Sequence, residues 1–190
     1  MRKILTALAA AASIAVPLVS QTKPDSGRSY TPADVHFMSG MIAHHAQAVL
    51  IAGWAPTHGA SRSLRALCER IVVGQTDEIG LMQRWLRDRH EPVLDVDTAH
   101  AMMPGMGHVM MMPGMLSAEQ LDTLNGAHGV AFDRLFLRYM IQHHQGAITM
   151  VNELFGQGAG EEEVVFRFAS DVFADQTTEI DRMQRMLAAL

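Results

Sequence analysis

Residues 41–48 read Met-Ile-Ala-His-His-Ala-Gln-Ala, and residues 140–147 read Met-Ile-Gln-His-His-Gln-Gly-Ala. The two stretches match at an offset of 99 residues, and Asp34 and Phe37 recur at that offset as Asp133 and Phe136. A second set recurs at an offset of 101: Gln75, Glu78, Ile79, Met82, Gln83, Arg84 and Leu86 are matched by Gln176, Glu179, Ile180, Met183, Gln184, Arg185 and Leu187. Two motifs repeated in the same order indicate an internal duplication, so the chain contains two copies of one unit.

The first copy has the pattern of a helical hairpin. Thr31 and Pro32 form an N-cap followed by proline at the first helical position, and Asp34 lies in the first turn. Apolar residues then recur at helical spacing, and either Ser61 or Ser63 caps the next helix. This unit is therefore expected to be two antiparallel helices joined by a short turn.

The second copy repeats that pattern after a short additional helix. Ser117 with Gln120 resembles a capping box, and a long helix is expected over about residues 128–155. The acidic residues 161–163 suit the positive end of a last helix. No strand-like alternation is present. The sequence therefore predicts an all-α protein, an antiparallel four-helix bundle built from two duplicated hairpins.

The N-terminal segment has the layout of a secretory signal. Arg2 and Lys3 precede an apolar run over residues 4–19, and polar residues follow it. The run contains Pro17 and is short for a membrane span. We expect cleavage and a periplasmic or secreted mature chain with no stable membrane span. The expected organisation is a signal peptide at 1–20, a flexible segment at 21–30, a first hairpin at 31–90, a methionine-rich linker at 91–116 and a second hairpin at 117–190.

Composition narrows the classes of function. The 190 residues carry a formal net charge of −5, which argues against a nucleic-acid partner. The single cysteine, Cys68, excludes an intrachain disulfide framework, a cysteine-rich zinc site and an iron–sulfur cluster. We expect it to be a buried small apolar residue. Fifteen methionines and ten histidines are the residues in excess, and they are where function is sought.

Polar residues interrupt the apolar faces of the expected helices at repeated positions. Because adjacent helical residues lie about 100° apart, we expect at most one histidine of each His-His pair to point squarely inward, with its neighbour on the flank of the helix. Buried polar groups need partners or a bound ion. Imidazole suits copper, zinc, iron or nickel, while thioether sulfur selects Cu(I). The candidate metal ligands on the helices are His143, His144, His44, His45, Met41, Met140, Glu78, Glu179, Met82 and Met183.

These residues have two other interpretations, a hydrogen bond without metal and a di-iron site. A His–Glu hydrogen bond across each hairpin would satisfy both groups without any metal. A di-iron carboxylate site is disfavoured, because each unit offers one inward glutamate and no Glu-x-x-His pair.

The linker supplies further soft ligands. Residues 100–115 contain seven methionines and two histidines, with two copies of Met-Pro-Gly-Met, and proline and glycine preclude a continuous helix. Met103 with Met106, and Met112 with Met115, repeat a Met-x-x-Met spacing, and His108 lies between them. A hydrophobic lid over the end of the bundle is the competing interpretation. The remaining histidines without a repeated context are expected at the surface: His36, His58, His90 and His128.

The repeated motifs resemble the domain of unknown function 305 family over roughly residues 31–189. The similarity is carried by Phe37 through His44-His45, by Gln75-x-x-Glu78-Ile79-x-x-Met82, by the stretch at 112–117 and by the second-copy motifs at 132–137 and 143–147. It implies a ferritin-like four-helix bundle that is usually exported, and copper binding linked to copper tolerance in some members. Ala43 and Ala46 depart from the more polar flanks often found around the first His-His pair, so the first unit is expected to be the weaker site.

We therefore expect an exported copper-binding protein for buffering or tolerance, with methionine and histidine ligands and another transition metal as a second option. No catalytic residues are assigned, and an enzyme is the less favoured class. The alternatives are a metal-dependent redox enzyme in the same bundle and a stress-related interaction protein that binds no metal. The expected partner is the metal ion itself, with a homo-oligomer or a metal-transfer partner left open.

Overall fold

A computed structural model describes residues 30–94 and 112–190 of the chain. Within these ranges the chain is all-α and contains no strand, as the sequence predicts. Its helices are α1 (Pro32–Ala52), α2 (Arg62–Asp88), α4 (Ala118–Asn125), α5 (Val130–Gly156) and α6 (Glu163–Ala188). None of the helices in these ranges is both long and apolar enough to cross a membrane. The expected signal segment and most of the linker lie outside the described residues.

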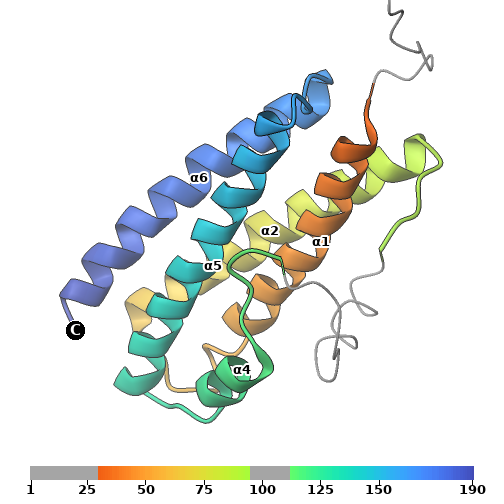
Figure 1. Cartoon of the computed structure of the whole chain (residues 1–190). Helices are drawn as coiled ribbons and strands as arrows, with labels where there is room; N and C mark the ends of the chain where they lie inside the picture. Colours follow the sequence, from red (N-terminus) through yellow and green to blue (C-terminus); the bar gives the residue numbers. More distant parts are fainter. Residues whose placement is uncertain (1–29, 95–111) are drawn as a thin grey trace, which may run out of the picture.

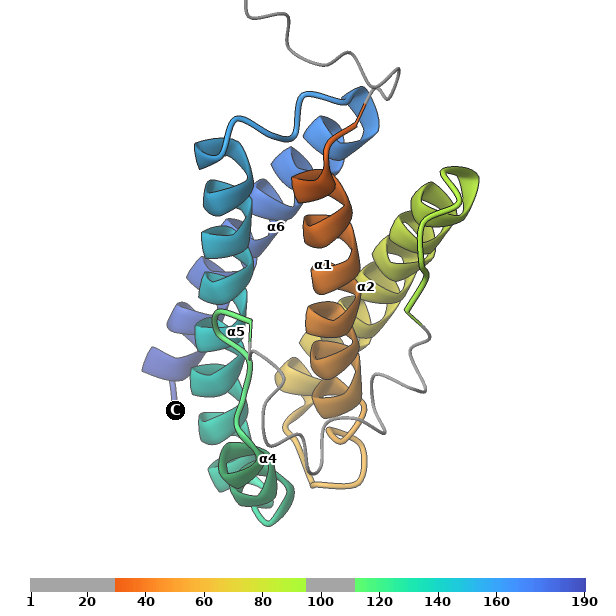
Figure 2. The same ribbon diagram turned by 45° about the vertical axis from the view of Figure 1, so that its right-hand side comes forward.

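The four long helices form two antiparallel hairpins that meet through their first helices. Helix α1 packs along α2, α5 packs along α6, and the hairpins join where α1 and α5 run side by side (Figures 1 and 2). Helix α2 ends at the opposite end of the molecule from the start of α5 (Figure 1). A long connection between the second and third long helices is typical of ferritin-like folds, and its described residues 112–129 lead to the start of α5.

The helix starts follow the predicted capping signals. Thr31 caps α1 with a capping box completed by Asp34, and Ser61 rather than Ser63 caps α2. Ser117 and Gln120 form the predicted capping box of α4. These caps satisfy amide groups that the first helical turn leaves unpaired.

The duplicated aspartates tie each hairpin to the other one. The amide of Gly160, just before α6, donates to Asp34 Oδ1 of α1 at 2.7 Å. In the equivalent place Asp133 of α5 accepts from the amide of Ser61, at 3.2 Å to each carboxylate oxygen. Both carboxylates are buried, so each aspartate fixes the turn of the opposite repeat.

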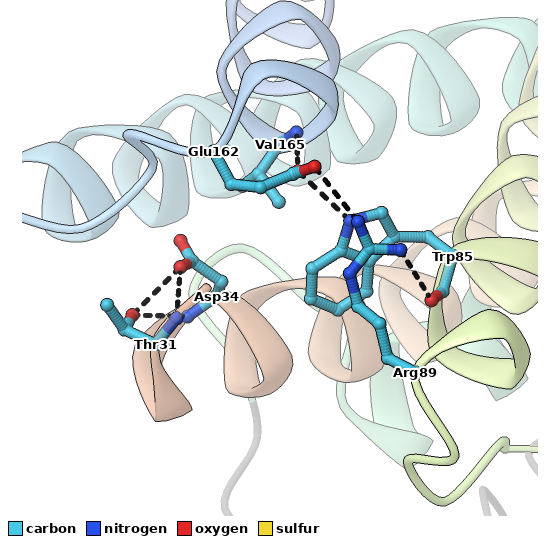
Figure 3. Close-up of polar contacts among 6 residues, drawn as sticks. All are labelled: Thr31, Asp34, Trp85, Arg89, Glu162 and Val165. Atoms are coloured by element: carbon cyan, nitrogen blue, oxygen red, sulfur yellow. Dashed lines mark hydrogen bonds and ion pairs between the residues drawn. The ribbon is translucent and has the colours of Figure 1, made fainter. Parts of the chain in front are cut away.

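A second link joins the end of α2 to the start of α6. Glu162 caps α6 by accepting from the amide of Val165 at 3.0 Å (Figure 3). The same carboxylate accepts from Trp85 Nε1 at 3.1 Å and from Arg89 Nη2 at 2.9 Å. Figure 3 shows these groups converging beside the Thr31–Asp34 cap of α1. This end of the bundle is therefore closed by one carboxylate shared among three donors.

The buried apolar residues fall into two clusters, one at each end of the α1–α5 contact. Cys68 is 2% exposed within the second cluster, which confirms its expected burial. Burial and the nearby Asp133 raise the pKa of its thiol to about 12. The thiol is therefore protonated at neutral pH, which is the unreactive form.

One expectation about the surface histidines is wrong. His36, His90 and His128 are exposed, but His58 is only 8% exposed. Its Nε2 lies 3.0 Å from the carbonyl oxygen of Asn125, at the end of α4. Its ring also lies against Phe132, with the centroids 5.0 Å apart and the ring planes tilted by 35°. His58 is buried because α4 and the start of α5 cover the turn between α1 and α2.

Candidate metal centre

The two His-His pairs lie at the middle of the α1–α5 contact, and all four side chains are fully buried. The histidine expected on the flank of each helix is therefore buried as well. Helices α1 and α5 each have neighbours on more than one side, since each packs against its own hairpin partner and against the other. Two adjacent residues on such a helix can both be covered.

The second histidine of each pair faces its own hairpin partner. His45 Nε2 lies 2.7 Å from Glu78 Oε2, and His144 Nε2 lies 2.7 Å from Glu179 Oε2. The glutamate side chains keep 24% and 17% of their surface exposed. Each pair is thus a buried imidazole that donates to a carboxylate at the rim of the bundle, and the two pairs repeat the sequence duplication.

The first histidine of each pair faces the opposite repeat. The ring centroids of His44 and His143 are 3.8 Å apart, with a 38° angle between the ring planes. The Nε2–H of His143 donates to the backbone oxygen of His44 at 3.0 Å. The Nε2–H of His44 donates to the backbone oxygen of Pro113 at 3.0 Å. Because a carbonyl oxygen only accepts, each Nε2 carries the proton.

The other ring nitrogen of all four histidines is left without a partner. The Nδ1 atoms of these residues are buried and have no hydrogen bond among the described residues. In a neutral imidazole protonated at Nε2, Nδ1 is a bare lone pair. Imidazole ligands of metals characteristically donate their second ring N–H to a carboxylate or a carbonyl, as these four rings do. Each of these four rings therefore has the hydrogen-bonding pattern of a metal-binding imidazole.

The protein environment lowers the pKa of His44, His143 and His144, which favours their neutral form. Burial, followed by the neighbouring His45, lowers the pKa of His44 from 6.5 to about 3. Burial and the charges of the surrounding histidines hold the pKa of His143 well below 6.5. Burial also lowers the pKa of His144, and outweighs the opposing effect of the hydrogen bond that His144 donates to Glu179. Neutral imidazole is the form that binds metal ions, so at neutral pH no proton has to be displaced.

Within residues 30–94 and 112–190, no three histidine, cysteine, aspartate or glutamate side chains form a group that could hold a metal ion. A site at the histidines would therefore need thioether donors as well. Met41 and Met140 lie three residues before His44 and His143, on the same helix faces, and both are fully buried. Met82 and Met183 are also fully buried, one in each core cluster.

The end of the methionine-rich linker lies directly on the histidines. We call residues 112–116 the strap; it crosses α5 beside α1 in Figure 2. Besides the bond from His44, the strap receives two bonds from Gln47: its Nε2 donates to the oxygen of Leu116 at 3.1 Å, and its Oε1 accepts from the Leu116 amide at 2.7 Å. Met112 and Met115 in the strap are half-buried. Met103, Met106 and His108 lie outside the described residues.

Gln47 and Gly146 are structural residues that the pattern of candidate ligands in the sequence did not indicate. They occupy equivalent positions of the two repeats. A Cβ atom on Gly146 would lie 1.9 Å from the backbone oxygen of Pro113, so only glycine lets the strap approach α5. The sequence does mark them: glutamine in one repeat and glycine in the other occupy the same position of a motif that otherwise matches. One repeat provides bonds for the strap, and the other provides space.

Several solved structures are similar to this chain in sequence and fold. A DUF305 protein from Streptomyces coelicolor is 28% identical, with 83% of this chain and 93% of that chain covered and a TM-score of 0.70. A DUF305 fragment from Deinococcus radiodurans is 29% identical, with coverages of 85% and 99% and a TM-score of 0.69. CopM in its Cu(II)-bound form is 29% identical, with coverages of 82% and 96% and a TM-score of 0.66.

CopM structures with Cu(I) and with silver also match, at TM-scores of 0.62 and 0.63. No curated protein matches the sequence. The family model described as "Domain of unknown function (DUF305)" matches residues 34–187, which include both hairpins. The chain therefore belongs to the DUF305 family.

Proposed function

We propose that this protein is an exported copper-binding protein that buffers copper for tolerance through histidine and methionine ligands. The observation that carries the proposal is the set of four buried Nδ1 lone pairs with no hydrogen-bond partner among the described residues. An unpaired polar atom in a protein interior costs free energy, and a bound ion would remove that cost. The CopM structures with Cu(II), Cu(I) and silver support copper as the ion.

In this proposal His44 and His143 are the principal ligands, because they join the two repeats at the centre of the bundle. His45 and His144 provide further imidazoles, oriented by Glu78 and Glu179. The thioethers of Met41 and Met140, and of Met115 in the strap, make the site soft and favour Cu(I) over harder ions, and Met112 at the start of the strap is a further thioether donor of the protein. Met103, Met106 and His108 would extend this donor set along the linker, while Met82 and Met183 are the remaining candidates on α2 and α6.

Export is part of the proposal and has two supports. The basic and apolar N-terminal sequence has the layout of a signal peptide. The Streptomyces coelicolor relative has itself been proposed to be secreted. Outside the cytoplasm, a copper buffer would act as a monomer, as a homo-oligomer or by passing its ion to another protein.

One observation favours a second candidate function. The His45–Glu78 and His144–Glu179 hydrogen bonds satisfy these groups and fix the register of each hairpin with no metal. A stress-related interaction protein would use the histidines in this way and bind no copper.

Competition for Cu(I) with a chromophoric chelator separates the two. The parent chain is compared with His143→Gln/His144→Gln, in which each amide keeps a donor but no imidazole lone pair. Exposed His90→Asn/His128→Asn is the matched control. The copper-binding proposal predicts tight Cu(I) in the parent and the control, and fewer bound ions in the core variant with its helical circular dichroism retained. Equal copper uptake by all three chains would remove these histidines from the site.

A further inference from the structure

A small pocket lies beside the strap, on the first-cluster side of the α1–α5 contact. Its volume is about 80 Å³, enough for an ion with a water molecule. It is bounded by α1, by α5 and by the strap. The potential ligands on its wall are His36, Met112, Met150 and Glu153. Of these four residues, only Met112 is among the candidate ligands predicted from the sequence.

Two methionine side chains converge in this pocket above Gly40 of α1. A Cβ atom at position 40 would lie 3.1 Å from the sulfur of Met112 and 3.5 Å from the terminal methyl carbon of Met150. The two thioether ends therefore meet over the space that this glycine leaves. One side chain comes from the strap and the other from α5, so the packing of the strap brings them together.

A histidine and a carboxylate stand at the rim of the same pocket. His36 lies one helical turn before Gly40 on α1, and Glu153 lies one turn after Met150 on α5. Both side chains are exposed. His36 can therefore turn its imidazole toward the thioethers, and Glu153 places a negative charge beside any cation held there.

The equivalent positions across the duplication show that packing does not require these residues. At an offset of 99, His36 and Gly40 correspond to Leu135 and Tyr139, and Met150 and Glu153 correspond to Ile51 and Trp54. All four equivalents are apolar or aromatic side chains that pack in or against the second core cluster. These four positions are filled by apolar and aromatic side chains at the second cluster. At the first cluster the equivalent positions place a glycine, a thioether, an imidazole and a carboxylate around a pocket.

We propose that this pocket is a second soft-metal site, separate from the four central histidines. The thioethers of Met112 and Met150 and the imidazole of His36 bind Cu(I) or Ag(I), and Glu153 offsets the charge of the ion. Two thioethers with one imidazole are a donor set that favours a soft monovalent ion. The proposal rests on the copper-binding function above and names an additional site for it. Because His36 is exposed, this site is open to solvent while the histidine site is buried.

Titration of the full chain with Ag(I), and with Cu(I) against a chromophoric chelator, tests the pocket. Met150→Leu keeps the volume of the side chain and removes its sulfur, and His36→Gln changes an exposed residue. Met186→Leu on α6 and His128→Gln are the matched controls. Each pocket variant is expected to bind one ion fewer than the parent, and each control to bind as many. In the parent with ¹³C-methyl-labelled methionine, the Met150 signal is expected to move on addition of Ag(I).

The outcomes separate this site from the central one. Parental stoichiometry and affinity in both Met150→Leu and His36→Gln would overturn the pocket site and leave the copper-binding function standing. A lost ion in these variants, with unchanged binding in His143→Gln/His144→Gln, would support the pocket and overturn the central histidines. A parent chain that binds neither ion would overturn both.

Discussion

The imidazole rings of His44 and His143 lie 3.8 Å apart between their centroids, although the residues are 99 positions apart in the sequence. They occupy equivalent positions of the two repeats, so the duplication brings a residue face to face with its own copy. Two rings this close and fully buried cannot both be positively charged imidazolium ions at low cost. The contact therefore requires neutral histidines, and that state leaves metal-binding lone pairs available.

The first prediction concerns stability against pH. The pKa of His44 in the folded chain is about 3 and that of His143 is well below 6.5, the ordinary value that both regain on unfolding. At a pH between the folded and the unfolded pKa, the unfolded chain therefore binds more protons than the folded chain. The free energy of unfolding then rises with pH across this range and falls on acidification below about 6.5. Each histidine should contribute about 1.4 kcal/mol per pH unit. Urea unfolding of the metal-free chain at several pH values measures this slope.

The control for that slope is His44→Gln/His143→Gln, because glutamine does not titrate. The slope between pH 6.5 and 4 should be smaller in this variant than in the parent. An identical slope in the two chains would assign the acid sensitivity to other groups.

The second prediction concerns the approach of the strap to α5. In Gly146→Ala the new methyl group would overlap the oxygen of Pro113, so the strap must move away. Overpacking of this kind costs about 1–3 kcal/mol. Gly74→Ala in α2 is the matched control: nothing lies within 4 Å of a Cβ atom there, so it should stabilise the chain by about 0.5–1 kcal/mol. In thermal unfolding, Gly146→Ala should lower the melting temperature and Gly74→Ala should raise it. Equal shifts in the two variants would contradict the close contact.

The third prediction concerns the single thiol. Cys68 is 2% exposed, and burial raises its pKa to about 12, so it has neither access nor thiolate character at neutral pH. A maleimide should react very slowly with the native chain and rapidly in urea. Fast native labelling would show that α2 opens around this position.

The sequence predicted those features that depend on local or repeated signals. The Thr31–Asp34 and Ser117–Gln120 capping boxes involve neighbouring residues, so their formation does not depend on the rest of the fold. The all-α class followed from apolar spacing alone. The duplication correctly indicated that the candidate histidines and glutamates occur as two equivalent sets, and the structure places them together.

Other features depend on how the hairpins meet, which the sequence pattern does not contain. Both histidines of each pair are buried because α1 and α5 have neighbours on more than one side, whereas helical periodicity assumes a single buried face. His58 is buried only because α4 lies over its turn. The pocket at Gly40 arises from a glycine, an exposed histidine and a methionine that have no repeated partner, so a search based on repetition passes over them.

The core histidines are proposed to offer bare Nδ1 lone pairs to a soft ion, and ¹⁵N NMR of the histidine rings observes these atoms themselves. The nitrogen signals of His44, His45, His143 and His144 are assigned with the glutamine variants and followed as Ag(I), a diamagnetic stand-in for Cu(I), is added. We expect rings protonated at Nε2 in the metal-free chain, and Nδ1 signals of His44 and His143 that move as the first ions bind. Unchanged Nδ1 signals in a chain that has taken up silver would contradict it.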